Sequence, residues 1–415
     1  MEPTISKNQR HWDSKGSVKM FLRISSAITA LVVTLAMGAG ASAADLPKAT
    51  QKALAKLKLD ASILKGLDKE LEMPKAWFDG AAKEDGAIIL GTWRDREFLR
   101  MAAPFKARYP NVKINYHRTG TRARGMKVLV AAREGRIIAD VTTSFADVYP
   151  QFKKMGALAD LRGLPNIKNL APGNVAPDGT WAAFKVSIRC MTYNKDLVKE
   201  ADLPKTWDDL LTNPRWRGGK LALSNHPGAW LLALWTAKGE KWGQDFTRRL
   251  FTEVDPQQRK EGMSASTALT IAGEFHANIP GNERRAKVYK ERGAPVGYHC
   301  PIPATYTRSQ IGMLEKAKNK NGASIFVNWL LSREGQILQY VHSYSIPSHK
   351  DLQLSQFIPF AETVMGKQSI TRDDNMIGSD LHKAMSKTWK SYWTKPVGKG
   401  RKRGKKRKGK SKKNQ

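Results

Sequence analysis

The chain has 415 residues, of which 41% are hydrophobic and 8% aromatic. This composition excludes a mostly disordered chain, and the length predicts about two or three domains. The 71 Lys and Arg against 37 Asp and Glu give a net charge of +34 and favour anionic partners, while only two cysteines exclude a disulfide-rich scaffold or a cysteine-based zinc module.

Residues 1–43 are typical of a secretory signal. Basic residues precede an apolar run of 17 residues, 24–40, and the small side chains of Ala41 and Ala43 follow it. The run is shorter than the ~20 residues that a membrane-spanning helix needs. We therefore expect cleavage near Ala43 and export to the periplasm by the general secretory route. An uncleaved anchor is the alternative, and translation from Met20 is an alternative start.

Residues 44–80 are rich in Lys and Leu and predict a helical N-terminal extension. After Gly80, short apolar strands alternate with amphipathic helices, which indicates an α/β fold with a parallel or mixed sheet. We expect strands over 87–90, 112–116 and 139–142. The first helix should have Phe98, Met101, Phe105 and Tyr109 on one face and a kink at Pro104. A second helix should bury Met126, Leu129 and Val130, and a third should span 145–154.

A second α/β unit follows from the strand 183–194. We expect further strands over 219–223 and 295–299, and helices over 206–211, 229–237, 241–251, 264–274, 322–332 and 335–340, with residues 351–394 forming outer helices. Ligands bind beyond the carboxyl ends of parallel strands. In the first unit these ends are Thr92-Trp93-Arg94, Gly120-Thr121-Arg122 and Thr143-Ser144.

The chain lacks the common motifs of enzyme active sites. No GxSxG, GxGxxG, P-loop or HExxH pattern occurs, and the eight His are scattered. We therefore predict a protein that is not an enzyme and that has no cofactor and no metal site.

Seven weak motifs in one order carry a family resemblance. They are AAKEDG at 81–86, FKARYPNVK at 105–113, GRIIADV at 135–141, YNKDLV at 193–198, PKTWDDLL at 204–211, PRWRGGKLAL at 214–223 and NWLLSREGQ at 328–336. Over about residues 76–350 the chain resembles the periplasmic solute-binding components of bacterial ABC importers, in the branch of the ferric-iron-binding proteins.

The resemblance implies a type 2 periplasmic binding protein fold, in which two α/β lobes joined by crossing strands close on one solute. The first lobe would be 81–182, the second lobe 183–304, and 305–394 would return to the first lobe and add C-terminal helices. The implied partners are a small solute, an inner-membrane permease and its ATPase, and we expect a monomer.

The sequence departs from the iron-binding members at the position of their tyrosine pair. Those members resemble one another in a Tyr-Tyr pair after a Gly-Glu helix end, but here Gly273-Glu274 is followed by residues 275–283, which contain no Tyr. Gly281 and Asn282 stand where the phenolates would be, and Tyr306 is the one other phenol that could serve. Bare ferric iron is disfavoured, and binding of ferric or chelated iron stays the alternative function.

We instead predict a small anionic solute, either a carboxylate, a phosphate or a phosphonate. Arg guanidinium groups bind such anions bidentately, and the helix N-termini after Gly120 and Gly228 add N–H donors. The predicted ligand-binding residues are Thr92, Trp93, Arg94, Thr121, Arg122 and Ser144 of the first lobe, and Ser224, Asn225, His226, Asn278 and Asn282 of the second. For each Arg a solvated surface position is the alternative, and for Trp93 ordinary packing within the lobe.

Two features remain outside this interpretation. In an oxidising compartment Cys190 and Cys300 could form a disulfide, the alternative being two buried thiols. The tail 395–415 holds 11 Lys or Arg and no acid between Lys399 and Lys413. We expect it to contact anionic lipid or lipopolysaccharide phosphates, with no specific nucleic acid, although a solvated tail without a partner is the alternative. A secreted basic protein that binds anionic polymers through this tail is the further functional alternative.

Overall fold

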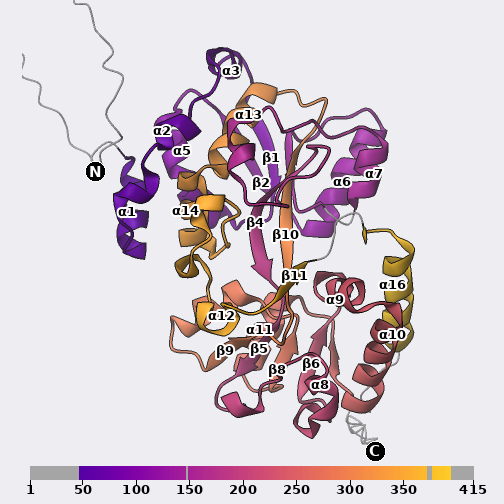
Figure 1. Cartoon of the computed structure of the whole chain (residues 1–415). Helices are drawn as coiled ribbons and strands as arrows, with labels where there is room; N and C mark the ends of the chain where they lie inside the picture. The colour runs from indigo at the N-terminus through magenta and orange to yellow at the C-terminus, as the bar shows by residue number, and fades with distance from the viewer. Residues whose placement is uncertain (1–45, 146–147, 372–375, 394–415) are drawn as a thin grey trace, which may run out of the picture. The chain divides into compact units, whose positions relative to one another are not determined.

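The computed structural model describes residues 46–145, 148–371 and 376–393 (Figure 1). The predicted signal peptide and the basic tail lie outside the described residues. Within the described part of the chain, no helix combines the length and the apolar character needed to cross a bilayer. The strands form two sheets, one in each of two lobes.

The sheet of the first lobe has the strand order β11-β10-β3-β1-β2, with β4 also paired to β10. Its strands are β1 (Ala87–Gly91), β2 (Ile114–Arg118), β3 (Val141–Thr143), β4 (Ala182–Ile188), β10 (Ala304–Met313) and β11 (Ser369–Thr371). β1 is parallel to β2 and β3, whereas β10 is antiparallel to β3 and β4, so the sheet is mixed. β4 and β10 run from the first lobe towards the second (Figure 1).

The helices of the first lobe follow the predicted alternation. They are α4 (Asp95–Met101), α5 (Ala103–Arg108), α6 (Thr121–Arg133), α7 (Tyr149–Lys154), η4 (Pro165–Asn169), α13 (Lys320–Leu331) and α14 (Arg333–Ser343). The predicted kink is a break at Ala102, because Pro104 cannot donate a helical hydrogen bond.

One predicted helix face is wrong in part. Leu129 of α6 is buried as predicted, but Met126 and Val130 are both 41% exposed, and Val128 is buried instead. The buried stripe passes through Gly125, where an added Cβ would come within 2.8 Å of the Val148 side chain. Glycine has no apolar side chain, so a pattern of apolar residues does not show that Gly125 faces the core. The predicted buried face of α6 was therefore rotated away from the observed one.

The N-terminal extension consists of α1 (Lys48–Leu57), η2 (Ala61–Leu64), α2 (Leu67–Glu70) and α3 (Lys75–Ala81). Leu54, Leu64 and Leu67 are buried in the core of the first lobe. Thr50 of α1 also donates to the buried carboxylate of Glu334 at 2.6 Å. The extension is therefore part of the first lobe's packing.

The sheet of the second lobe has the order β7-β6-β8-β5-β9. Its strands are β5 (Met191–Asn194), β6 (Leu221–Ser224), β7 (Gln257–Arg259), β8 (Ala277–Ile279) and β9 (Val296–His299). The surrounding helices are η5 (Glu200–Asp202), α8 (Asp209–Thr212), η6 (Pro214–Trp216), η7 (Pro227–Ala229), α9 (Leu231–Lys238), α10 (Glu240–Arg249), η8 (Leu250–Val254), α11 (Met263–Ile271) and α12 (Glu283–Lys290). Four tryptophans, Trp207, Trp216, Trp230 and Trp235, are fully buried in its core.

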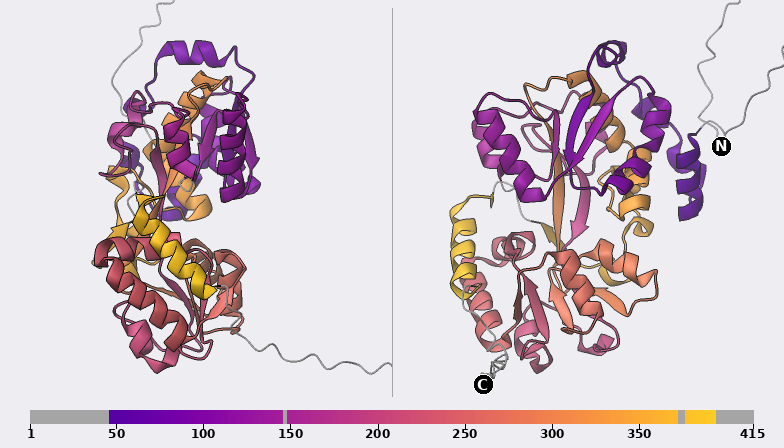
Figure 2. Two further views of the ribbon diagram at one scale, coloured as in Figure 1. Left: turned by 90° about the vertical axis from the view of Figure 1, so that its right-hand side faces the viewer. Right: turned by 180° about the vertical axis from the view of Figure 1, so that it is seen from behind.

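The last helix that the structure describes lies on the second lobe. After η9 (Lys350–Leu352), η10 (Ser355–Phe357) and α15 (Ala361–Val364), β11 pairs with β10 in the first sheet. The last helix, α16 (Asp380–Trp393), then lies along α10 (Figure 2) and buries Met385 and Trp389 in the second lobe's core. The segment 305–394 thus returns to the first lobe and then adds its last helix to the second.

Candidate functional site

The two lobes meet where the chain crosses between the sheets. We call this region the lobe junction and define it by the segments 185–192, 280–285 and 300–305. Cys190, between β4 and β5, forms a disulfide with Cys300, between β9 and β10. The Tyr298 hydroxyl donates to Ile188 O and accepts from Cys190 N, both at 2.9 Å. These bonds join the two crossing segments to each other.

The loop before α12 packs directly on the first crossing segment. Gly281 N donates to Cys190 O at 2.6 Å, and an added Cβ at Gly281 would lie 2.6 Å from Thr192 N, so only glycine fits there. Asn282 then caps α12: its Oδ1 accepts from Arg285 N at 3.1 Å and its amide donates to Ser264 Oγ at 3.0 Å. This arrangement places Glu283 and Arg284 at the lobe junction.

Glu283 is neutralised by a neighbour on the crossing segment. Its Oε2 accepts from Arg189 Nη1 at 2.9 Å, and the two side chains are 1% and 12% exposed. A buried carboxylate needs such a partner, because an isolated buried charge is costly.

Lys185 has no such partner. It lies on β4, is 4% exposed, and forms no hydrogen bond or ion pair with any residue that the structure describes. Its Nζ lies 5.1 Å from the centre of the Phe184 ring. Burial above all, and then the charges of Arg284 and Arg189, hold the pKa of Lys185 well below its ordinary value.

Arg284 of α12 is similarly under-satisfied. Its guanidinium makes one long hydrogen bond, from Nη1 to Ser343 O at 3.4 Å, and its Nε is buried with no acceptor among the described residues. Burial lowers the pKa of Arg284, with Arg189 adding to the effect and Glu283 opposing it. The buried Lys185 and the half-buried Arg284 are therefore two cations without a carboxylate in contact.

Hydroxyl groups accompany these cations. Ser187 lies two residues after Lys185 and so on the same face of β4, and in the register with β10 it stands opposite Thr307. The hydroxyls of Ser187 and of Thr92 are buried and have no hydrogen-bond partner in the described chain. Thr92 precedes α4, whose Glu97 is close enough to raise the pKa of Lys185. Cationic side chains and hydroxyl groups that lack partners within the protein can donate hydrogen bonds to a bound oxyanion.

Comparison with known proteins identifies the family. A model of the bacterial extracellular solute-binding proteins matches residues 100–365, well over half of the chain. The chain belongs to this family. An uncharacterised protein of Haemophilus influenzae is 33% identical over 150 residues, which are 35% of this chain and 42% of that one. Iron uptake protein A1 of Synechocystis is 28% identical over 188 residues, 41% of this chain and 51% of that one. The chain thus spans about half the length of the curated relatives it matches, or less.

Solved structures show the same architecture. Iron-bound HitA from Pseudomonas aeruginosa superposes with a TM-score of 0.60 at 20% identity, covering 73% of this chain and 99% of that one. AfuA from Actinobacillus pleuropneumoniae, with exogenous fructose-6-phosphate bound, gives 0.58 at 20% identity, covering 74% and 97%. At this identity the likeness shows the fold alone, and it confirms the predicted two-lobed periplasmic binding protein fold.

In this solute-binding protein, the predicted first-lobe residues separate into different environments. Thr92 has a buried hydroxyl without a partner in the described chain. Trp93 is 2% exposed, donates to Gln339 Oε1 at 3.2 Å and packs on Phe184, so it belongs to the core. Arg94 is exposed at the start of α4 and lies 3.8 Å from Glu97. α6 begins at Thr121, but the side chains of 121–124, including Arg122, lie outside the described part.

Ser144 has a left-handed backbone with φ 55°, and its N donates to Gln310 O at 2.6 Å. That bond fixes the turn at the end of β3, beside the sheet's central strands.

The predicted second-lobe residues are mostly engaged within that lobe. Ser224 is buried and bonded to Ser266 Oγ at 3.0 Å, Asn225 accepts from Trp389 Nε1 at 2.9 Å, and His226 is exposed. Asn278 is buried and accepts from the hydroxyls of Thr192 and Thr270 at 2.7 and 2.8 Å. Asn282, which caps α12, is the second-lobe residue that the fold brings to the lobe junction.

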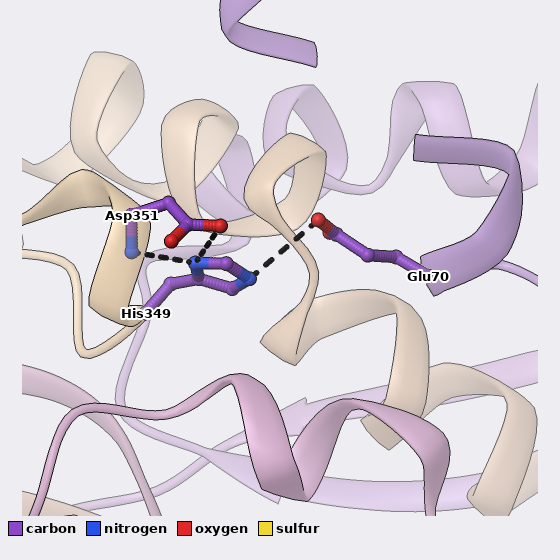
Figure 3. Close-up of side chains that lie close together, drawn as sticks. All are labelled: Glu70, His349 and Asp351. Carbon is purple, nitrogen blue, oxygen red and sulfur yellow. Dashed lines mark hydrogen bonds and ion pairs between the residues drawn. The ribbon is translucent and has the colours of Figure 1, made fainter. Parts of the chain in front are cut away.

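A separate cluster has side chains that are typical of a metal site. Figure 3 shows Glu70, His349 and Asp351, whose ligand atoms lie within 4.8 Å of one another. Glu70 already accepts from Arg333 N at 2.8 Å and from Arg333 Nε at 2.5 Å. A guanidinium on the same carboxylate opposes a bound cation, so we assign this cluster to anchoring the extension on α14.

Sequence reasoning missed Lys185, Arg189 and Arg284. A signal for Lys185 exists, because it is the one charged residue in the otherwise apolar and small-residue strand 182–188. The two arginines carry no such signal in a chain with 71 basic residues.

Proposed function

We propose that this protein is the extracytoplasmic solute-binding component of an ABC-type importer and captures a small anionic solute at the lobe junction. The observation that carries the proposal is a pair of cations without a carboxylate in contact, the buried Lys185 and the half-buried Arg284. Family membership supports the transport role.

Lobe closure is the mechanism that this arrangement supports. Lys185 belongs to the first lobe and Arg284 to the second, so an anion that contacts both stabilises the state in which the lobes are together. Because the solute binds the closed state more tightly than the open state, it shifts the population towards the closed state. A permease and its ATPase would recognise this closed state. Release of the solute would follow when the permease stabilises the open state.

A thermal-shift screen of the mature chain against carboxylates, phosphates and phosphonates tests the proposal, followed by calorimetry on the best ligand. Charge-assisted hydrogen bonds contribute about 1.5–3 kcal/mol each, so we expect Lys185→Met or Arg284→Met to weaken binding by roughly ten- to a hundredfold. Lys52→Met is the matched control, because Lys52 is exposed on α1.

Unchanged dissociation constants in both junction variants would contradict the proposal. Deletion of residues 395–415 distinguishes solute binding at the lobe junction from the alternative function, binding of polyanions by the basic tail. We expect this deletion to leave solute affinity unchanged, and a complete loss of binding would favour the alternative.

Ferric or chelated iron is the second candidate function, because named relatives include Iron uptake protein A1 and iron-bound HitA. The loop 280–285 offers one carboxylate, that of Glu283, which Arg189 already engages. The local charge therefore favours an anion over a bare cation, while an anionic iron chelate remains compatible with the same cations.

A further inference from the structure

The charges at the lobe junction can be paired off one by one. Glu283 is bonded to Arg189 at 2.9 Å, and Glu97 lies 3.8 Å from Arg94. The groups whose charge acts on Lys185 are Arg284, Arg189, Glu283 and Glu97. After these two pairs are set aside, Lys185 and Arg284 remain of these groups, and Arg285 of the same loop, whose guanidinium lies 5.4 Å from the centre of the Tyr289 ring, is not among those that act on Lys185.

The two remaining cations approach the same stretch of chain at the end of α14 and just after it. Arg284 Nη1 donates to Ser343 O at 3.4 Å, and Val186, next to Lys185, donates its N–H to Ile346 O at 2.9 Å. Lys185 is 4% exposed and Arg284 is half-buried. A single negative charge would neutralise only one of them and leave the other unpaired with little water around it, which is costly. Two negative charges at one point would balance both.

We propose that the solute carries a compact doubly charged head group, a phosphomonoester or a phosphonate, held between Lys185 and Arg284. This inference rests on the proposed function and names the class of solute for the same site. A phosphoryl group offers three acceptor oxygens, whereas a carboxylate offers two in one plane and a single charge.

The donors at the lobe junction match this number of oxygens. Arg284 supplies a planar fork of N–H groups, Lys185 a point charge with three donors, and Ser187 a buried hydroxyl without a partner. Because Lys185 and Arg284 come from different lobes, the dianion also joins the lobes, and a monoanion would do so less strongly.

Three probes test the charge requirement: methyl phosphate, dimethyl phosphate and sulfate. Methyl phosphate is a dianion at about pH 8 and takes up a proton near pH 6, dimethyl phosphate is a monoanion throughout, and sulfate keeps both charges. By calorimetry in a chloride buffer at about pH 8, we expect methyl phosphate to bind at least about tenfold more tightly than dimethyl phosphate. Lys185→Met and Arg284→Gln should each abolish this preference, and Lys52→Met should keep it.

The pH dependence adds a second measurement. As the pH falls from about 8 to about 5, the affinity for methyl phosphate should fall relative to that for sulfate, because only methyl phosphate loses a charge. Taking the ratio of the two affinities removes the titration of the protein's own groups. If Lys185→Met does not fold, Arg284→Gln and the pH ratio still decide the matter.

Equal affinity for methyl and dimethyl phosphate would overturn the inference. Binding of succinate or citrate in the absence of any binding of methyl phosphate or sulfate would also overturn it, while leaving the proposed function intact. If no anion of any class binds, the proposed function itself fails.

Discussion

Gly281 donates its backbone N–H to the carbonyl oxygen of Cys190 at 2.6 Å. Cys190 is disulfide-bonded to Cys300 on the other crossing segment, and Lys367 Nζ donates to Cys300 O at 2.7 Å from a third segment. The loop that presents Glu283 and Arg284 is therefore held by the same backbone that connects the lobes. A change in the crossing segments should reach the candidate anion site through this hydrogen bond and through the ion pair between Arg189 and Glu283.

Removal of the disulfide should lower both stability and affinity. The two cysteines are 110 residues apart in sequence, and losing such a link typically costs about 2–5 kcal/mol. We expect Cys190→Ser combined with Cys300→Ser to lower the free energy of unfolding in urea by this amount. The affinity for the anionic solute should also fall, because Gly281 loses a fixed partner.

The wild-type protein in a dithiol reductant should behave as the double serine variant does. Identical unfolding curves with and without reductant would show that the bond contributes nothing to stability. A loss of stability without any change in the dissociation constant would show that it does not position the loop.

Replacing Lys185 should stabilise the protein in the absence of solute. The pKa of Lys185 is lowered in the folded state, so the unfolded chain binds more protons and stability rises with pH up to the lysine's unfolded pKa near 10.4. We expect Lys185→Met to raise the free energy of unfolding at neutral pH. This gain should shrink as the pH rises towards about 10.

Urea unfolding across this pH range, with Lys52→Met as control, provides the measurement. A gain that did not change with pH would mean that the lysine's charge is not the source of the cost.

Much of the fold could be predicted from the pattern of apolar residues, because strands and helices that bury a face must repeat with a fixed period. The break before Pro104 is confirmed for a different reason, the missing N–H of proline. β10 was missed as a strand, since Ala304–Met313 includes Thr305, Thr307 and Gln310, which are polar and nevertheless buried. Their burial depends on β4 lying alongside, and the local sequence holds no trace of that pairing.

The candidate site was less predictable than the fold. The expectation that ligands bind beyond strand ends led to Asn282, which lies in the lobe junction, and to Thr92, whose buried hydroxyl has no partner in the described chain. It also led to Ser224 and Asn278, which are bonded inside the second lobe. Lys185 and Arg284 are 99 positions apart, and only the crossing of the two lobes brings their charges together. The absence of a counter-charge becomes visible only when all neighbours are known.

Acid should destabilise the protein through His349. Burial lowers the pKa of this histidine from 6.5 to about 4, so the unfolded chain takes up a proton first as the pH falls. The free energy of unfolding should therefore decrease between about pH 6.5 and pH 4, by about 3 kcal/mol at most from this group. We expect His349→Asn to flatten this decrease, because Asn can still accept from Asp351 N as His349 Nδ1 does.

Glu70 is present in both proteins. Because burial raises its pKa, its contribution to the pH dependence of the free energy of unfolding has the opposite sign to that of His349. This contribution cancels when the wild-type and His349→Asn curves are subtracted. Parallel stability curves for wild type and His349→Asn would contradict the assignment. Added Zn²⁺ should stabilise neither protein, because Arg333 occupies Glu70.

Asn225 should affect the attachment of α16 and leave solute binding unchanged. Its Oδ1 accepts from Trp389 Nε1 at 2.9 Å, and Trp389 is 1% exposed. Losing one such bond costs about 0.5–1.5 kcal/mol, so Asn225→Ala should lower the midpoint of thermal unfolding slightly. Calorimetry should give the wild-type dissociation constant, and a tenfold or greater loss of affinity would instead return Asn225 to the ligand site.

Ferric citrate should leave the protein colourless. The tyrosines near the lobe junction are unsuited to binding Fe³⁺ as phenolates. Tyr298 is fully buried with its hydroxyl bonded to Ile188 O, and burial raises its pKa well above 10. The guanidinium groups of Arg285 and Arg308 lie 5.4 and 5.8 Å from the ring centres of Tyr289 and Tyr306, and these cations would repel a bound Fe³⁺. A tyrosinate-to-iron charge-transfer band should therefore be absent from the visible spectrum, even if the chelate binds as an anion and shifts the unfolding midpoint. The appearance of such a band, and its loss in Tyr306→Phe, would show that the protein binds iron through a phenolate and that an anion is the wrong ligand class.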